Sequence, residues 1–183
     1  MNRHQCIYIA LGSNQAHMGK TPARTLCFAL GELVRRGVQI EAASRPWRTP
    51  AWPDPSDPPF SNACARVTTG LEPGALLDVL HEVEDVFGRA RGKRNAPRTL
   101  DLDLIDYRGR VSGQGGDGLI LPHPRAAARS FVLLPLREIA PDWRDPVSGL
   151  DIDRLVARLG AKDRARARPD GPPLVPLAVQ HGA

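Results

Sequence analysis

The segment 97–104, Pro-Arg-Thr-Leu-Asp-Leu-Asp-Leu, constrains the fold of this chain more than any other stretch. Its leucines alternate with Asp101 and Asp103, and alternation with a period of two is typical of a half-buried β-strand. The leucines would face the core, and both carboxylates would project from the opposite face. At a rise of about 3.3 Å per residue the two Asp Cα atoms lie about 6.6 Å apart, so their side chains can converge on one site.

Two carboxylates held this close repel each other unless a cation lies between them. Mg²⁺ suits such a place, because proteins bind it through one or two carboxylates together with substrate phosphates. The alternative is an exposed strand face with two solvated acids, and the spacing alone does not decide between the two interpretations.

A basic segment immediately precedes the paired acids. It contains no acidic residue and five cationic ones, namely Arg89, Arg91, Lys93, Arg94 and Arg98. A run of charges is usually a solvated face. Next to two carboxylates on a strand, however, we interpret it as a phosphate clamp that faces a metal site.

The 183 residues are enough for one well-packed domain, which we place at residues 1–160, followed by an Arg- and Pro-rich tail at 161–183. No segment approaches the ~20 apolar residues of a membrane span, and the N-terminus lacks the features of a signal peptide. Cys6, Cys27 and Cys64 show no metal-ligand spacing and suit a reducing compartment. We therefore expect a cytoplasmic protein that does not associate with membranes, and we expect it to be a monomer. The net charge of +5 favours polyanionic partners, either nucleotides or nucleic acid, and composition does not separate these.

Hydrophobic periodicity predicts strands and helices in the order βαββαβ. The expected elements are a strand at 6–11, a helix at 22–36, strands at 38–44 and 60–68, a helix at 73–87 and the strand that carries the paired acids. This order is the split βαβ of ferredoxin-like folds, an α+β class with helices packed on an antiparallel sheet.

In the second half of the chain, the sequence predicts fewer helices and strands than in the first half. We expect a short strand at 119–121, a helix at 131–139 with Ser130 as its N-cap, and a last helix at 151–159. The later helices could cover the second face of the sheet and complete a three-layer αβα arrangement. From residue 160 onward we expect either a mobile tail or an extended strap over the surface.

A proline-rich loop at 49–59 and the strand after it form a second candidate site. Five prolines in eleven residues keep the loop irregular, and long loops inside compact domains are usually functional or disordered. Trp52 on this loop would be a wall for a flat ligand or a plug that packs the loop down. Phe60 and Asn62 share one strand face, where a ring and an amide could stack on a planar heterocycle and read its edge. A core position is the alternative for Phe60.

Two other function classes fit parts of the sequence. Gly19-Lys20-Thr21 resembles the end of a phosphate-binding P-loop, but the position that needs the first glycine holds Asn14. Ferredoxin-like sheets with basic loops also bind RNA. The paired acids would repel a phosphate backbone unless metals were bound, so we expect no nucleic-acid partner.

Six segments in this order resemble the hydroxymethyl-dihydropterin pyrophosphokinases of folate biosynthesis. They span residues 7 to about 142, and the segment with the paired acids is the most specific. The segments are Tyr-Ile-Ala-Leu-Gly-Ser-Asn at 8–14, Arg-Thr-Pro at 48–50, Phe-Ser-Asn-Ala at 60–63, the segment 97–104, Leu-Pro-His-Pro at 121–124 and Arg-Ser-Phe at 129–131.

The resemblance implies a ferredoxin-like fold and transfer of the pyrophosphoryl group of ATP to the hydroxymethyl oxygen of the pterin, with release of AMP. It implies that Asp101 and Asp103 bind two Mg²⁺ ions and act in catalysis together with Arg91 and Arg98. The ATP-binding residues would be His81, Glu84, Arg89, Arg91, Arg98, Leu104, His123 and Arg129. The pterin-binding residues would be Thr49, Pro50, Trp52, Phe60, Asn62 and Phe131. The substrates are thus small molecules, ATP and the dihydropterin.

The sequence departs from the family pattern at four places. Asn95-Ala96 stands where many relatives have an aromatic residue and glycine, so this loop lacks the aromatic lid residue of those relatives, and Trp52 is the candidate to compensate. Phe60 lacks the hydroxyl of a tyrosine found in some relatives. His81 replaces a glutamine-like contact, and Pro124 follows His123 where some relatives have tyrosine.

Overall fold

The computed structural model describes residues 6–51, 54–89, 98–113 and 119–178. Within them the elements are β1 (Ile7–Ser13), α1 (Pro22–Arg35), β2 (Gln39–Ala43), β3 (Trp47–Thr49), β4 (Phe60–Thr68), α2 (Pro73–Val86), β5 (Asp101–Tyr107), η2 (Ala126–Ala128), α3 (Ser130–Ile139), α4 (Ile152–Arg158), α5 (Ala161–Arg166) and β6 (Arg168–Pro169). The described part contains no helix long and apolar enough to cross a membrane.

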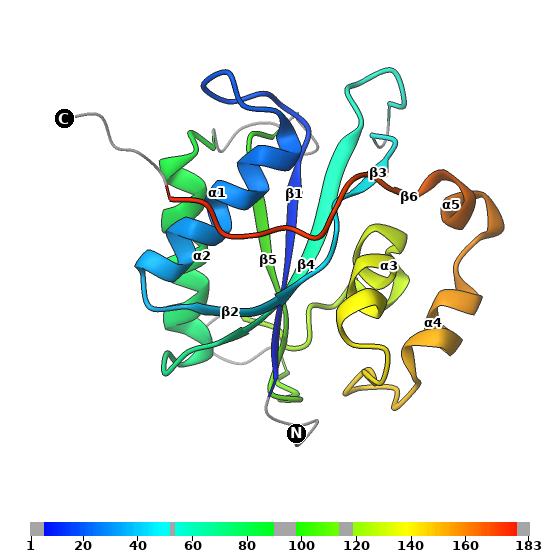
Figure 1. The fold of residues 1–183 in the computed structure, drawn as a ribbon. Helices are drawn as coiled ribbons and strands as arrows, with labels where there is room; N and C mark the ends of the chain where they lie inside the picture. Colours follow the sequence, from blue (N-terminus) through cyan, green and yellow to red (C-terminus); the bar gives the residue numbers. More distant parts are fainter. Residues whose placement is uncertain (1–5, 52–53, 90–97, 114–118, 179–183) are drawn as a thin grey trace.

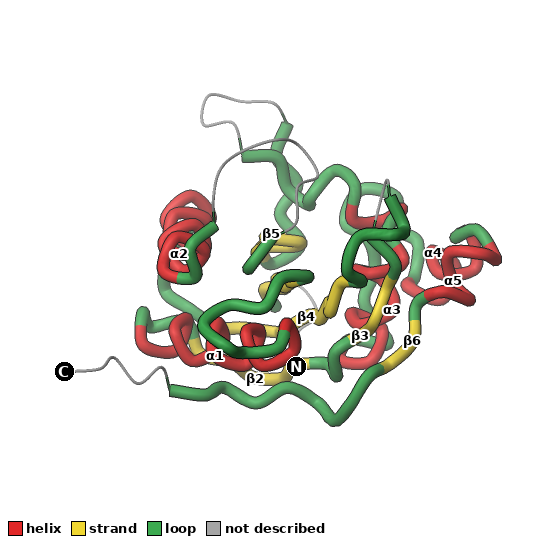
Figure 2. The backbone as a smooth tube through the Cα atoms, turned by 90° about the horizontal axis from the view of Figure 1, so that it is seen from above, coloured by secondary structure: helices red, strands yellow, loops and turns green. Residues whose placement is uncertain are grey.

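The described strands form one antiparallel sheet in the order β5-β1-β4-β3-β6, and β2 pairs with β4 beside β3. Helices α1 and α2 lie on one side of the sheet, and α3, with α4 and α5 beyond it, lies on the other (Figures 1 and 2). The ferredoxin-like α+β arrangement is therefore confirmed, including the helical layer on the second face.

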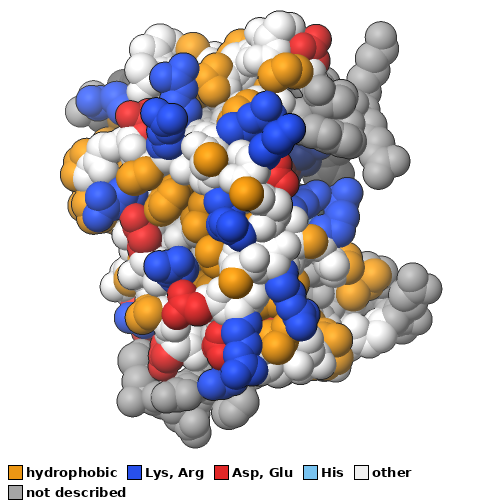
Figure 3. All heavy atoms as spheres, turned by 90° about the vertical axis from the view of Figure 1, so that its right-hand side faces the viewer, with side chains coloured by type: hydrophobic (Ala, Val, Ile, Leu, Met, Phe, Trp, Pro, Cys, Tyr) orange, Lys and Arg blue, Asp and Glu red, His pale blue; other side chains and the backbone are white. Residues whose placement is uncertain are grey.

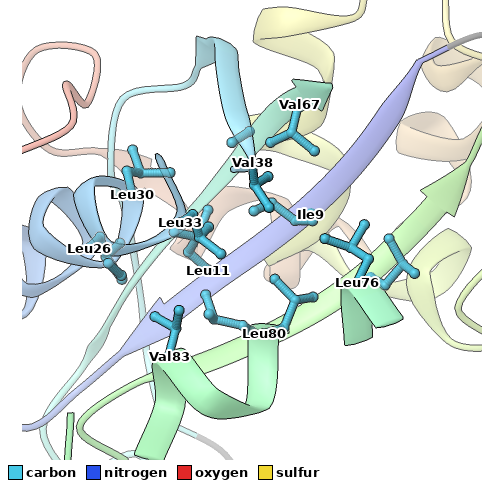
Figure 4. Packing of buried hydrophobic residues seen from close by; sticks show 14 of the residues in the cluster. Ile9, Leu11, Leu26, Leu30, Leu33, Val38, Val67, Leu76, Leu80 and Val83 are labelled. Carbon is cyan, nitrogen blue, oxygen red and sulfur yellow. The ribbon is translucent and has the colours of Figure 1, made fainter. Parts of the chain in front are cut away.

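Alternating strand residues divide the core into two clusters. On the α1/α2 side, Ile9 and Leu11 of β1 pack with Leu30 and Leu33 of α1 and Leu80 of α2 (Figure 4). The leucines of the 97–104 segment belong to this cluster too, as the alternation predicted. On the opposite side, a second cluster contains residues of β1 and β5 together with α3 and α4. The paired acids therefore lie on the α3 side of the sheet.

Local expectations failed at two points. Residues 119–121 form no strand, because the contact there is an isolated bridge between Ser112 and Leu121. Ser130 is not the N-cap of α3 but its first residue, and the N-cap is Arg129, whose side chain forms no capping hydrogen bond. A serine before an apolar run indicates a nearby helix start, but not which residue takes the extended conformation.

The segment after residue 160 is a strap through residue 178. It forms α5 and the short strand β6, which pairs with β3, and then crosses the molecule beside α1 (Figure 1). Backbone N–H groups of Asp170, Leu174 and Leu177 donate to Pro46, Ser44 and Cys27. Leu174 is buried with the α1/α2 cluster. Of the two alternatives, the structure shows the strap.

Candidate active site

The sheet register places Asp101 and Asp103 beside the face of Asn62. Gly12 in β1 pairs with Asn62 on one side and with Asp101 on the other, and Ala10 pairs with Cys64 and Asp103 in the same way. The middle strand thus has no side chain larger than a methyl group between the acids and β4. This leaves a flat floor that joins the two candidate subsites.

Arginines from separate segments reach the paired acids. Arg89 Nη2 lies 2.9 Å from Asp101 Oδ1, and Arg98 Nη1 lies 2.7 Å from Asp101 Oδ2. Arg129 Nη1 lies 3.8 Å from Asp103 Oδ2. The basic segment therefore does face the carboxylates at both of its described ends. Arg91, Lys93 and Arg94 lie outside the described residues.

The two acids differ in their electrostatic environment. Partial burial, reinforced by the charge of Asp101, raises the pKa of Asp103 above its ordinary value. Among the residues that the structure describes, Asp103 has no ion pair as short as those of Asp101, so it is the less well compensated carboxylate. A bound cation would relieve this repulsion, and the described residues contain no group of three or more His, Cys, Asp or Glu that could hold a metal alone. The donor set fits Mg²⁺ shared between two carboxylates and substrate oxygens.

His123 and Arg129 supply polar groups opposite Asp103. Burial lowers the pKa of His123, against the pull of Asp103 in the other direction, so the ring is neutral at pH 7. Its Nδ1 accepts a hydrogen bond from the Arg125 N–H at 3.1 Å, so that the neutral ring carries its proton on Nε2. Burial also lowers the pKa of Arg129, which remains charged.

A cavity of about 200 Å³ adjoins Asp103 between α2, β5 and the 119–124 segment. Two of the predicted ATP-binding residues, Leu104 and His123, line it. The lining consists of Leu77, Asp103, Leu104, Leu119, Ile120, His123 and Pro124. A largely apolar wall next to charged groups suits a base or sugar attached to phosphates.

The predicted nucleoside residues of α2 do not line this cavity. Glu84 is 1 % exposed, so its carboxylate lies inside the fold and not on the open surface. Its Oε1 accepts the Leu102 N–H at 2.7 Å, and the carboxylate forms an ion pair with Arg89. Glu84 thereby fixes the edge strand β5 and one arginine of the site. A nucleoside contact by His81, which is half-buried, or by Glu84 stays a prediction.

Three of the predicted pterin-binding residues, Thr49, Phe60 and Asn62, lie where β3 pairs with the start of β4. Asn62 Nδ2 donates to Thr49 Oγ1 at 2.8 Å, and both residues are buried. Phe60 and Phe131 are half-buried and make no ring contact with each other in the described part of the chain. Pro50 follows at the exposed end of β3, and Trp52 lies outside the described residues.

Sequence reasoning missed two residues that shape this site. A Cβ on Gly12 would lie 3.0 Å from Asn62 Oδ1 and 3.9 Å from Phe60 Cδ1, so the glycine makes the space beside these side chains. Asn14, to which sequence reasoning assigned no site role, is buried and bonded to both Arg98 and Pro58. The signal was present in the Gly-Ser-Asn motif at the end of β1, which belongs to the first family segment. Lys20, by contrast, lies over the ring of Phe28, 5.0 Å from its centroid, which is a surface role.

Comparison with known proteins identifies the family. Residues 8–141 match the family model of 7,8-dihydro-6-hydroxymethylpterin-pyrophosphokinase. The chain belongs to this family.

Similar proteins cover the chain to different extents. A 2-amino-4-hydroxy-6-hydroxymethyldihydropteridine pyrophosphokinase of Synechocystis sp. is 43% identical over 67% of this chain, which spans 62% of that protein. A pyrophosphokinase of the same name from Methylorubrum extorquens is 38% identical over 83% of this chain and 92% of its own length. A crystal structure of Plasmodium falciparum HPPK-DHPS aligns with a TM-score of 0.64 at 12% identity, over 90% of this chain and 46% of that one. At 12% identity, the similarity to the Plasmodium falciparum structure shows a shared fold alone. This chain spans less than half of that larger protein.

Proposed function

We propose that this chain transfers the pyrophosphoryl group of ATP to 6-hydroxymethyl-7,8-dihydropterin. The hydroxymethyl oxygen attacks the β-phosphorus, the bond from that phosphorus to the oxygen bridging it to the α-phosphate breaks, and AMP leaves. The hydroxyl proton passes to solvent. The observation that carries the proposal is the family match over residues 8–141, which includes the paired acids and the arginines around them.

Asp101 and Asp103 would hold two Mg²⁺ ions, with the remaining ligands coming from ATP phosphates and water. When bound, the ions neutralise and orient the triphosphate. This role is supported by the incomplete charge compensation of Asp103, whose pKa is raised by burial and by the charge of Asp101. On this proposal, Arg89 and Arg98 turn from Asp101 to the phosphates when the substrate arrives.

The arginines around the paired acids would neutralise the negative charge that shifts between the phosphate groups during the reaction. Arg98 lies next to Asp101 and Arg129 next to Asp103, and the proposal adds Arg91 from the family resemblance. His123 Nε2–H can donate to a phosphate oxygen while the ring is neutral. Phosphoryl-type transfer depends on positioning and charge stabilisation more than on a covalent protein intermediate, and no nucleophilic side chain is required.

The pterin would lie on the floor above Gly12. Phe60 and Phe131 would stack on its two faces, and Asn62 with Thr49 and Pro50 would read its polar edge. The hydrogen bond between Asn62 and Thr49 supports this role, because it fixes the amide in one orientation. Trp52 would close the site from the proline-rich loop.

We further infer that the protein acts on small molecules as a cytoplasmic monomer. Cys6, Cys27 and Cys64 are unpaired, which suits a reducing compartment. Lys and Arg side chains are scattered over the face of α3 and α4 with Asp and Glu among them (Figure 3), as in the Arg137–Asp153 pair at 3.2 Å. Sedimentation analysis at micromolar concentration would detect a dimer and so contradict the monomer.

Product analysis tests the reaction. Purified protein is incubated with Mg-ATP and the dihydropterin, and nucleotides and pterins are separated. AMP formed in equal amount with pterin diphosphate is the expected result. ADP would indicate transfer of a single phosphoryl group, and turnover independent of the pterin would indicate hydrolysis. Either result would overturn the proposal, and loss of activity in Lys20→Ala would then favour a P-loop mechanism.

A further inference from the structure

We propose that Asn14 is a positioning residue that couples the pterin subsite to the phosphate subsite. The inference rests on the proposed function, because it assigns those two ligands to the two sides of the site. Asn14 follows the last residue of β1 and is 3 % exposed. It therefore lies where the floor of the site ends, between Arg98 and Pro58.

The side chain of Asn14 joins these two loops. Its Oδ1 accepts the Arg98 N–H at 2.7 Å, and its Nδ2 donates to the Pro58 carbonyl oxygen at 3.1 Å. Residues 14 and 98 are tied further by the backbone, since the N–H groups of Asn14 and Gln15 donate to the Arg98 carbonyl oxygen at 3.1 and 3.2 Å. The Arg98 connection thus has three bonds, whereas the Pro58 connection rests on the side-chain amide.

Both ends of this bridge lead directly to substrate-facing groups. Arg98 Nη1 continues the path to Asp101 Oδ2 at 2.7 Å. Pro58 is two residues before Phe60, the ring expected to stack on the pterin, and it is the second-last residue of the proline-rich loop at 49–59. A ligand that orders Phe60 and this loop also fixes the position of the Pro58 carbonyl group. That carbonyl group orients the Asn14 amide, whose oxygen accepts the hydrogen bond from the Arg98 N–H.

The chemistry of the bridge requires an amide. A buried side chain at this position has to accept a hydrogen bond from one backbone group and donate one to another. An ionised carboxylate can only accept, and a methyl group can do neither. Losing either bond leaves a buried polar group unpaired, at a cost of about 1–3 kcal/mol. The position of one loop therefore depends energetically on the position of the other, and the coupling acts equally in both directions.

Asn14→Asp separates the two connections. The ionised carboxylate still accepts from the Arg98 N–H but has no N–H for Pro58. Asn14→Ala removes both side-chain bonds and leaves the two backbone bonds. Gln15→Ala is the matched control, because Gln15 contributes its backbone N–H to the bridge and its side chain is exposed.

The measurement is the dissociation constant of the dihydropterin with and without Mg²⁺ and α,β-methylene-ATP, which cannot be cleaved. In the unmodified protein and in Gln15→Ala, we expect the nucleotide analogue to tighten pterin binding by about 5–150-fold, the usual range of coupling between sites. In Asn14→Asp this factor should fall close to one while affinity for the analogue alone changes little. Asn14→Ala should lose the factor and also bind the analogue more weakly.

Equal coupling factors in the unmodified protein and Asn14→Asp would overturn the inference, as would a factor of one in the unmodified protein. Should both variants fail to fold, amide hydrogen exchange at Arg98 in the unmodified protein decides: pterin binding should slow it, and unchanged exchange would refute the bridge. AMP production distinguishes the two proposals. If the unmodified protein makes AMP but Asn14→Asp keeps its coupling, the bridge alone fails. If no AMP forms, the proposed function fails whatever the coupling.

Discussion

At the scale of single residues, the two acids of β5 are unequal although the sequence presents them as a matched pair. Asp101 is flanked by two arginines within 3 Å, whereas among the described residues the arginine closest to Asp103 is 3.8 Å away. Partial burial and the neighbouring charge of Asp101 raise the pKa of Asp103. Charge compensation at Asp103 is therefore left for a ligand to complete.

The substitutions Asp101→Asn and Asp103→Asn should shift the stability of the substrate-free protein in opposite directions. At pH 7, Asp103→Asn should raise the melting temperature by ~1–4 °C, because it removes a poorly compensated charge. Asp101→Asn should lower it, since two arginines lose their partner. Both variants should lose pyrophosphoryl transfer by orders of magnitude. Calorimetric melts with and without substrates check this, and a stabilised, fully active Asp103→Asn would refute the metal-binding assignment.

The gain from Asp103→Asn should also depend on pH. The folded-state pKa of Asp103 lies above its unfolded value of about 3.9, so ionisation of this group costs stability. That cost is absent below the unfolded value and grows as the pH rises through the folded-state pKa. The two melting curves should therefore coincide near pH 3.5 and separate toward pH 7. A difference that stays constant over this range would exclude Asp103 ionisation as its cause.

Gly12→Ala should impair pterin binding specifically. The new Cβ would lie 3.0 Å from Asn62 Oδ1, so the amide that reads the pterin edge has to move. We expect the KM for the pterin to rise about tenfold, equivalent to about 1.4 kcal/mol, while nucleotide affinity changes little. Gly70→Ala is the control, because no atom lies within 4 Å of its new Cβ. A matching loss in both variants would point to a general folding defect instead.

At the scale of elements, the site depends on contacts between segments that periodicity does not report. Strand β5 lies at an edge of the described sheet, and Glu84 of α2 accepts the outward N–H of Leu102. Helix α1 is covered by the strap, where Gly31 meets the Leu177 carbonyl oxygen. A Cβ on Gly31 would lie 1.8 Å from that oxygen. The strap can approach so closely only because this position is glycine.

Gly31→Ala should destabilise the protein, although this change in a helix normally stabilises it by about 0.5–1 kcal/mol. The strap has to leave its place beside α1, which exposes Leu174 and breaks the bond from Leu177 to Cys27. Gly74→Ala in α2 is the control, since its Cβ meets no atom within 4 Å. Thermal melts and limited proteolysis of the strap provide the readout. Equal stabilisation by both substitutions would show that the strap does not rest on Gly31.

At the scale of the whole molecule, the core and the candidate metal site are separate features. Two core clusters hold the sheet between helical layers, and the described residues provide no three-residue metal cage. A metal would therefore bind together with its nucleotide, where phosphate oxygens supply the missing ligands.

Chelation should abolish turnover without melting the protein. In the absence of ATP, EDTA and Mg²⁺ should give melting temperatures within about 1 °C of each other. With ATP present, Mg²⁺ should raise the melting temperature. At a ligand concentration of 100 Kd, binding adds about 2.7 kcal/mol to the free energy of unfolding. Differential scanning fluorimetry over the four combinations measures this. A large drop on EDTA addition without ATP would show a structural metal instead.

By itself, the sequence determined the βαββαβ core elements and the type of chemistry. Leucines that alternate with Asp101 and Asp103 could be assigned to two faces, because a strand has a period of two and a core excludes unpaired charge. Helices with apolar stripes were found for the same reason, and family motifs indicated the reaction. Strand alternation, apolar helix stripes and short motifs are local properties, because each depends on residues that are close together in the sequence.

Only the tertiary structure decided which groups meet across the sheet. The inequality of Asp101 and Asp103, the burial of Glu84 and the bridge of Asn14 from Arg98 to Pro58 join residues from different segments. The strap depends on Gly31 and Leu177, 146 positions apart in the chain. Periodicity describes which face a residue takes, whereas electrostatic balance and hydrogen bonding depend on which other segment the fold brings against that face.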